Sequence, residues 1–178
     1  DEAFATYDIA QKGNQWDTDT VIVDDELRIL LATLPKGVLM EAFLDTCHSG
    51  TGLRAEDLLS GRRPRFLPPP TVSGLRTVEN ALRRGTVNEV VKALPSGSRP
   101  VLYAGCRSDQ TSADATFAGR SSGAFTYYLL KALDADASRP RSAILTELTA
   151  SLRSNDFGQR PTLEGPSKAK KTAVGDPW

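Results

Sequence analysis

An apolar run that stops abruptly is the feature of this chain that most constrains its fold. Residues 38–44 are apolar except for Glu41, and Asp45, Thr46 and Cys47 follow at once, before a glycine-containing turn. A run that is apolar on both faces is typical of a central strand in a parallel sheet. Such a strand is stiff, and functional side chains collect in the loops beyond the carboxyl ends of parallel strands. Cys47 is therefore a candidate nucleophile at the end of a buried strand.

A single cysteine near a strand is more often a packing residue, so its neighbours decide between the two interpretations. They form the segment Asp45-Thr46-Cys47-His48-Ser49-Gly50-Thr51-Gly52-Leu53. This segment closely resembles the nucleophile motif of metacaspases and their bacterial relatives, the caspase-like cysteine peptidases. The resemblance favours Cys47 as the nucleophile.

The resemblance continues on both sides of this motif. Upstream it includes Asp24-Asp25-Glu26-Leu27 and Leu34-Pro35-Lys36-Gly37-Val38. Downstream it includes Tyr103-Ala104-Gly105-Cys106-Arg107-Ser108-Asp109-Gln110-Thr111-Ser112-Ala113-Asp114 and Gly123-Ala124-Phe125-Thr126, which look like the start of the small-subunit region of the family. It covers most of the chain, apart from the middle linker and the last dozen residues.

A nucleophilic thiol needs a base or a positive neighbour, because an ordinary thiol is mostly protonated at neutral pH. The only histidine is His48, and neighbouring residues at a strand end usually point in different directions. In the family the catalytic histidine lies upstream, in a Ser-Gly-His-Gly loop that does not occur here. We interpret His48, like Ser49 and Gly50, as a motif residue of uncertain role.

The resemblance therefore implies a missing amino-terminal segment that carries the base. A truncated gene, a proteolytic product whose other fragment stays bound, and a partner protein that supplies the histidine in trans all remain open. The expected fold is α/β and caspase-like, with a mostly parallel sheet flanked by helices on both faces and incomplete at the amino-terminal side. Strand 38–44 would then have an unpaired apolar edge, which proteins ordinarily avoid.

Three regions are expected: residues 1–53 with the nucleophile, an Arg/Pro-rich linker and helical segment at 54–98, and a small-subunit region at 99–178. We expect strands at 3–7, 99–104 and 159–163, and a polar loop at 11–20. Helices are expected from a cap at Asp24 to a stop at Pro35 and Gly37, and at 87–94 and 124–133. A further helix has an apolar face made by Ile144, Leu145, Leu148 and Leu152. A Lys-rich polar tail follows.

The resemblance implies peptide-bond hydrolysis, with attack by Cys47 and protonation of the leaving amine by a histidine. Asp45 lies two residues before the nucleophile, where its carboxylate could form an acidic specificity pocket for arginine or lysine. The alternative is that Asp45 only caps the turn after the strand. A preference for basic residues would make the linker a target for self-cleavage. The candidate sites are Arg62, Arg63, Arg65, Arg83 and Arg84.

No cofactor is required by this chemistry, but calcium activates many metacaspases. Asp1, Asp24 and Asp25 resemble the carboxylates that bind the ion, and hard oxygen ligands suit Ca²⁺. A further expected carboxylate is replaced by Arg54, which weakens the site. Helix capping explains Asp24 and Asp25 without a metal.

A polar cluster follows the predicted strand 99–104. Its members are Asp109, Gln110, Thr111, Ser112 and Asp114. They either line the substrate cleft or form a turn through side-chain contacts to the backbone. Cys106 is interpreted as a packing residue.

The overall composition fits one α/β domain, with 178 residues of which 39% are hydrophobic. The 22 basic and 22 acidic residues balance, which gives no support for binding to nucleic acid or to a membrane surface. The expected partners are the amino-terminal segment or a second chain that supplies the histidine, and protein or peptide substrates. A catalytic thiol favours the reducing cytoplasm. The main alternative function is a catalytically inactive caspase-like scaffold for binding or assembly; a thiol-dependent acyl transferase has no supporting motif.

Overall fold

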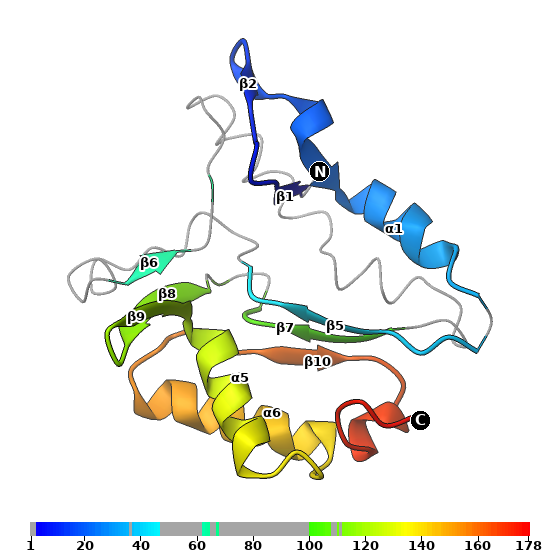
Figure 1. Ribbon diagram of the computed structural model, residues 1–178, viewed down its shortest axis with the longest axis vertical. Helices are drawn as coiled ribbons and strands as arrows, with labels where there is room; N and C mark the ends of the chain where they lie inside the picture. Colours follow the sequence, from blue (N-terminus) through cyan, green and yellow to red (C-terminus); the bar gives the residue numbers. More distant parts are fainter. Residues whose placement is uncertain are drawn as a thin grey trace.

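The computed structural model of the chain describes residues 3–35, 37–46, 62–64, 67, 100–107, 110 and 112–178. Figure 1 shows the arrangement of its elements. In chain order they are β1 (Ala3–Ala5), β2 (Gln11–Lys12), β3 (Gln15–Trp16), the 3-10 helix η1 (Thr18–Thr20), β4 (Val21–Val23), α1 (Asp24–Ala32), β5 (Glu41–Leu44), β6 (Arg63–Pro64), β7 (Val101–Ala104), β8 (Ala113–Phe117), β9 (Arg120–Gly123), α5 (Ala124–Ala135), α6 (Arg141–Ser154), β10 (Thr162–Glu164) and the 3-10 helix η2 (Ala169–Lys171).

The central sheet has the order β10-β7-β5 among the described strands. β5 and β7 are parallel, with Leu44 opposite Ala104, and β10 is antiparallel to β7. All four residues of β7 are buried, whereas no residue of β5 is fully buried and Phe43 is 41% exposed. The observed strand begins at Glu41, three residues later than predicted. Among the described strands β7 has a neighbour on each side and β5 pairs only with β7, so the central position of strand 38–44 in a complete sheet stays a prediction.

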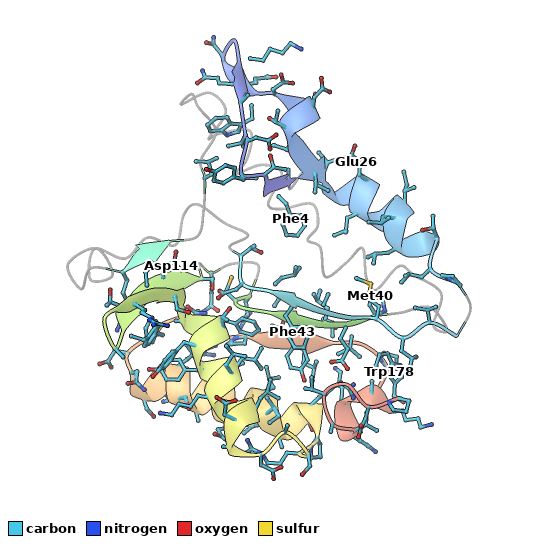
Figure 2. All side chains as sticks on the ribbon, in the orientation of Figure 1. Phe4, Glu26, Met40, Phe43, Asp114 and Trp178 are labelled. Carbon is cyan, nitrogen blue, oxygen red and sulfur yellow. The ribbon has the colours of Figure 1, made fainter. Side chains whose placement is uncertain are left out.

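Alternate residues of β7 face two different helical layers. Val101 and Tyr103 belong to the larger core cluster, which α5 and α6 complete. Leu102 points the other way and packs with Leu31 of α1 in a second cluster that includes Phe4 and Met40. Figure 2 shows Phe4 and Met40 on the α1 side of the sheet. The described part of the chain is thus a mixed α/β structure with helices against both faces of the β5–β7 pair.

Helix α1 begins one residue earlier than predicted from its cap. Val23 is the N-cap and Asp24 is the first helical residue, so the prediction that Asp24 caps the helix is wrong. The Glu26 side chain closes the amino terminus instead, because its Oε2 accepts a hydrogen bond from the Val23 backbone N–H at 3.1 Å. The helix ends at Ala32, before Pro35, as the stop signals predicted.

The small-subunit region contains a hairpin that the sequence analysis missed. β8 and β9 pair antiparallel around Ala118 and Gly119, whose φ angles are 49° and 81°. Positive φ at both central residues is the signature of the type I′ turn, and Gly119 adopts it without steric cost. The predicted loop 11–20 likewise contains the short hairpin β2–β3 and η1. Residues 87–94 lie outside the described part of the chain.

Helices α5 and α6 are confirmed, with Ile144, Leu148 and Leu152 buried and Leu145 packed at the edge of the core. The final strand β10 begins at Thr162, three residues later than predicted. The polar tail beyond it is more ordered than expected, since Ala169 and Ala173 are buried. The cause is a fully buried arginine on α6, Arg141, which donates to the Ala169 carbonyl at 3.0 Å.

Candidate active site

The carboxyl ends of β5 and β7 lie side by side, which brings the segment before Cys47 against residues 105–106. The Gly105 N–H donates to the Leu44 carbonyl at 2.7 Å. The Cys106 sulfur lies 3.5 Å from the Thr46 carbonyl oxygen and 3.3 Å from that of Gln110. The backbone is therefore fixed up to the residue that precedes Cys47. Cys47 itself, with His48, Ser49 and Gly50, lies outside the described residues.

The Asp45 carboxylate is bound on both oxygens by groups from distant parts of the chain. Oδ1 accepts a hydrogen bond from the Ser112 hydroxyl at 2.6 Å. Oδ2 accepts one from the Thr126 hydroxyl at 2.6 Å and one from the Thr126 N–H at 3.2 Å. Asp45 thus joins the end of β5 to the loop before β8 and to α5. Its partners lie 67 and 81 residues away in sequence.

Asp45 also completes the amino terminus of α5. Gly123 is the N-cap of this helix and has no side chain with which to cap it. Thr126 is the third helical residue, whose N–H an N-cap side chain ordinarily binds. Asp45 binds that N–H from another strand, and its negative charge suits the positive end of the helix. Asp45 therefore acts as a cap for α5. The turn after its own strand, which the alternative role for Asp45 concerned, lies outside the described residues.

A buried amide supports Ser112 from behind. Gln159 Nε2 lies 2.9 Å from the Gly105 carbonyl oxygen and 3.2 Å from the Ser112 hydroxyl, and its Oε1 accepts from the Ala113 N–H at 3.0 Å. Ser112 is fully buried and Gln159 is 4% exposed. The backbone partners assign the amide orientation, because a carbonyl needs a donor and an N–H needs an acceptor. Gln159 therefore donates to the Ser112 oxygen.

Gly105 has no side chain, and the Ser112 hydroxyl, Phe125 and the Asp45 carboxylate lie around the space that a side chain would enter. A Cβ placed on Gly105 would lie 3.0 Å from the Ser112 hydroxyl oxygen, 3.2 Å from the Phe125 Cβ and 3.3 Å from Asp45 Oδ1. These distances are tighter than ordinary van der Waals contact. A side chain at position 105 would therefore force the Ser112 hydroxyl, Phe125 or Asp45 to shift by a few tenths of an ångström.

The structure separates the members of the predicted polar cluster. Ser112 reaches Asp45, whereas Asp114 lies on β8 opposite Gly123 and Arg63. Gln110 joins a different segment, because its Nε2 donates to the Gly158 carbonyl at 3.0 Å and its Oε1 accepts from the Arg160 N–H at 2.8 Å. Asp109 and Thr111 lie outside the described residues. Cys106 is fully buried, which confirms the prediction that it packs in the core.

The predicted metal site falls largely outside the described residues. Asp1 is not described, and Asp24 and Asp25 are placed only as the first two residues of α1. Within the described ranges no group of three or more His, Cys, Asp or Glu side chains is arranged to hold a metal ion. The role of Asp1, Asp24 and Asp25 in calcium binding stays a prediction, as Arg54 is also outside the described part.

Two of the arginines proposed as self-cleavage sites lie in or beside β6. The Arg62 guanidinium donates to the Asn155 carbonyl at 2.9 Å and to the Asp156 carbonyl at 2.5 Å, and its carbon lies 4.1 Å from the centre of the Phe157 ring. Arg63 pairs through its backbone with Asp114 of β8. Arg65, Arg83 and Arg84 lie outside the described residues.

Sequence reasoning assigned no role to Thr126 or Gln159. One signal for Thr126 was available: a glycine at the start of an apolar helix leaves that helix without a side-chain cap, so another residue must supply one. No comparable signal marks Gln159, because its partners, the Gly105 carbonyl, the Ser112 hydroxyl and the Ala113 N–H, lie 46 to 54 residues away in sequence. Among the described helices, none has the length and apolar composition needed to cross a membrane.

Comparisons with known proteins agree with the sequence motifs. The model of the metacaspase peptidase C14 domain matches residues 1–56. Metacaspase-1 of Ajellomyces capsulatus is 29% identical over 169 residues, which cover 80% of this chain and 47% of that protein. Metacaspase-1A of Aspergillus oryzae is 27% identical over 190 residues, covering 92% of this chain and 43% of that protein. The chain thus spans less than half the length of these relatives.

A solved structure shows a related fold. The crystal structure of a Geobacter sulfurreducens protein superposes with a TM-score of 0.55 and 24% identity, covering 92% of this chain and 63% of that one. This similarity concerns the fold alone and agrees with a caspase-like α/β arrangement. The family match and the metacaspase relatives confirm the resemblance seen in the motifs: the chain is similar to the metacaspases.

Proposed function

We propose that this chain is part of a cysteine endopeptidase of the metacaspase type that cleaves after arginine or lysine. The observation that carries the proposal is the position of Asp45. Its carboxylate is anchored at the carboxyl end of β5, two residues before Cys47, by hydrogen bonds from Ser112 and Thr126. A fixed carboxylate two residues before a nucleophile in sequence favours substrates with a basic side chain, arginine or lysine.

The proposed reaction begins with the Cys47 thiolate. Its sulfur attacks the scissile carbonyl carbon, and the carbonyl electrons move to the oxygen. When the C–N bond breaks, a histidine protonates the leaving amine, and water then hydrolyses the thioester and regenerates the thiol. The backbone N–H of Cys47 is one donor to the negative oxygen of the intermediate.

The histidine in this mechanism is not His48. We propose that it belongs to the amino-terminal segment of the same polypeptide or to a second chain, since the 178 residues hold only His48. We also propose that this segment continues the mostly parallel caspase-like sheet beyond β5. Its support is the parallel register of β5 with β7 and the helices against both faces of this pair.

Three subordinate proposals accompany this function. Self-processing within residues 54–98 follows from the preference for basic residues, calcium activation through Asp1, Asp24 and Asp25 follows from the resemblance, and a reducing cytoplasmic location follows from the thiol.

A catalytically inactive scaffold is the second candidate function. One observation favours it: Asp45 caps α5, and this structural role needs no substrate.

The test is cleavage of fluorogenic peptides that end in Arg, Lys or Asp. The 178-residue chain, the full-length polypeptide that contains it and full-length Cys47→Ala are compared, with and without calcium. Cleavage of the Arg or Lys peptides by the full-length protein, lost in Cys47→Ala, is expected. Absence of cleavage by any folded form would favour the scaffold, and preferential cleavage after Asp would contradict the role given to Asp45.

A further inference from the structure

Two hydroxyl groups from separate segments converge on the Asp45 carboxylate, one on each oxygen. Ser112 lies 2.6 Å from Oδ1 and Thr126 lies 2.6 Å from Oδ2. A carboxylate held on one oxygen can still turn about its last torsion, which is broad in aspartate. One short bond on each oxygen removes this freedom. The plane of the Asp45 carboxylate is therefore set by Ser112 and Thr126 together.

The direction of the Ser112 hydrogen bond is fixed by a third residue. A serine hydroxyl has one proton to donate and lone pairs to accept with. Gln159 Nε2 donates to the Ser112 oxygen at 3.2 Å, so the single Ser112 proton is directed to Asp45. Burial of both Ser112 and Gln159 strengthens these bonds by excluding water.

These donors orient the carboxylate without cancelling its charge. The Ser112 hydroxyl, the Thr126 hydroxyl and the Thr126 N–H are all neutral groups. A lysine or arginine in their place would pair with the charge on which recognition of a basic substrate depends. Neutral donors fix the orientation of the carboxylate and add no opposing charge of their own, so substrate binding need not order it.

We propose that Ser112 and Thr126 are specificity-positioning residues, which hold the Asp45 carboxylate in the orientation that binds the arginine or lysine of the substrate. This inference rests on the proposed function. It assigns a task to two residues that have no part in the chemical step, and it makes Gln159 their support. It also explains why Gly105 has no side chain, because a Cβ there would press on both Ser112 and Asp45.

The test uses the full-length polypeptide and the Arg and Lys peptides. Thr126→Val removes one hydroxyl and keeps the backbone N–H and the side-chain shape, and Ser112→Ala removes the other. Each is expected to raise KM for the Arg peptide about tenfold with kcat within about twofold of wild type, since a lost hydrogen bond to a charged group corresponds to about that factor. Thr126→Ser restores the hydroxyl and should return KM to within about twofold of wild type.

A matched control is Thr146→Val on the exposed side of α6, which should leave both constants unchanged. Thermal melting checks that each variant folds, and Ser112→Ala keeps the test valid if Thr126→Val does not fold. An unchanged KM in both variants, or a loss of kcat alone, would overturn the positioning role while the protein remains a basic-specific peptidase. No cleavage of Arg or Lys peptides by folded wild-type protein would overturn the proposed function itself.

Discussion

Glu41 and Arg141 form an ion pair that joins β5 to α6, 100 residues apart in sequence. Arg141 is fully buried and Glu41 is 14% exposed at its side chain. The same guanidinium donates to the carbonyl oxygens of Ala169 and Asp176, and it lies 5.0 Å from the centre of the Trp178 ring. Arg141 thus holds both β5, the strand that leads to the candidate nucleophile, and the last residues of the chain.

Arg141→Met is therefore expected to destabilise the protein strongly. The substitution leaves the Glu41 carboxylate without its ion-pair partner. It also removes the hydrogen bonds from Arg141 to the carbonyls of Ala169 and Asp176, which hold η2 and the residues after it. Removing one partner of a buried pair costs about 3–5 kcal/mol. Urea unfolding measures the change. Arg153→Met, an exposed position on the same helix, is the control and should cost less than about 0.5 kcal/mol. Equal losses for both variants would show that the ion pair does not contribute.

Gly105→Ala is expected to cost about 1–3 kcal/mol, because the new methyl group overpacks the space shared with Ser112 and Asp45. The loss should be smaller when it is measured in the Ser112→Ala background, where the nearest atom, the hydroxyl oxygen at 3.0 Å, is absent. A double-mutant cycle on the free energy of unfolding makes the comparison. Strict additivity of the two substitutions would contradict the contact.

Arg62→Ala is expected to destabilise the carboxyl end of α6 by about 1–2 kcal/mol. The variant loses two hydrogen bonds to the carbonyls of Asn155 and Asp156 and the contact with the Phe157 ring. Arg62→Lys should recover only part of this, since an ammonium lacks the planar fork of the guanidinium. The melting temperatures of the two variants, compared with wild type, measure both losses of stability. Full recovery by lysine would mean that charge alone, without the fork, accounts for the effect.

Tyr103→Phe is expected to change the stability of the protein at alkaline pH. Burial raises the pKa of the Tyr103 phenol above its ordinary value near 10, although Arg141 acts in the opposite direction. The folded state keeps the phenol proton at a pH at which the unfolded chain releases it, so stability falls as pH rises above about 10. Phenylalanine removes this contribution, and the variant should lose less stability between about pH 10 and 11.

At neutral pH the same substitution should be neutral or stabilising by about 1 kcal/mol. The Tyr103 hydroxyl is buried and has no hydrogen-bond partner among the described residues, so its removal eliminates a desolvation cost. Urea titrations across this pH range test both effects. Tyr7→Phe, at a fully exposed position, is the control and should match wild type at neutral pH. A large loss of stability in Tyr103→Phe at neutral pH would show that the hydroxyl is bonded.

Local patterns in the sequence were sufficient for the elements that carry strong periodicity. The apolar spacing of Ile144, Leu148 and Leu152 predicted α6, and Pro35 marked the end of α1. The motif around Cys47 indicated the similarity to metacaspases, which the comparisons also found. These signals are local, because helix periodicity and stop residues act within a few positions of the chain. The hairpin β8–β9 was missed although its alternation and Gly119 were present in the sequence.

Only the tertiary structure determined the hydrogen-bond partners of Asp45 and the order of the strands in the sheet. The sequence identified Asp45 as a candidate for substrate recognition, but its partners Ser112 and Thr126 become neighbours only when β5, β7 and α5 pack together. In the same way the apolar composition of residues 38–44 predicted a buried strand, but only the pairing shows that β7 has a neighbour on each side among the described strands. Hydrogen bonds between residues 67 or 81 positions apart leave no periodic trace in a sequence, since they depend on packing and not on local conformation.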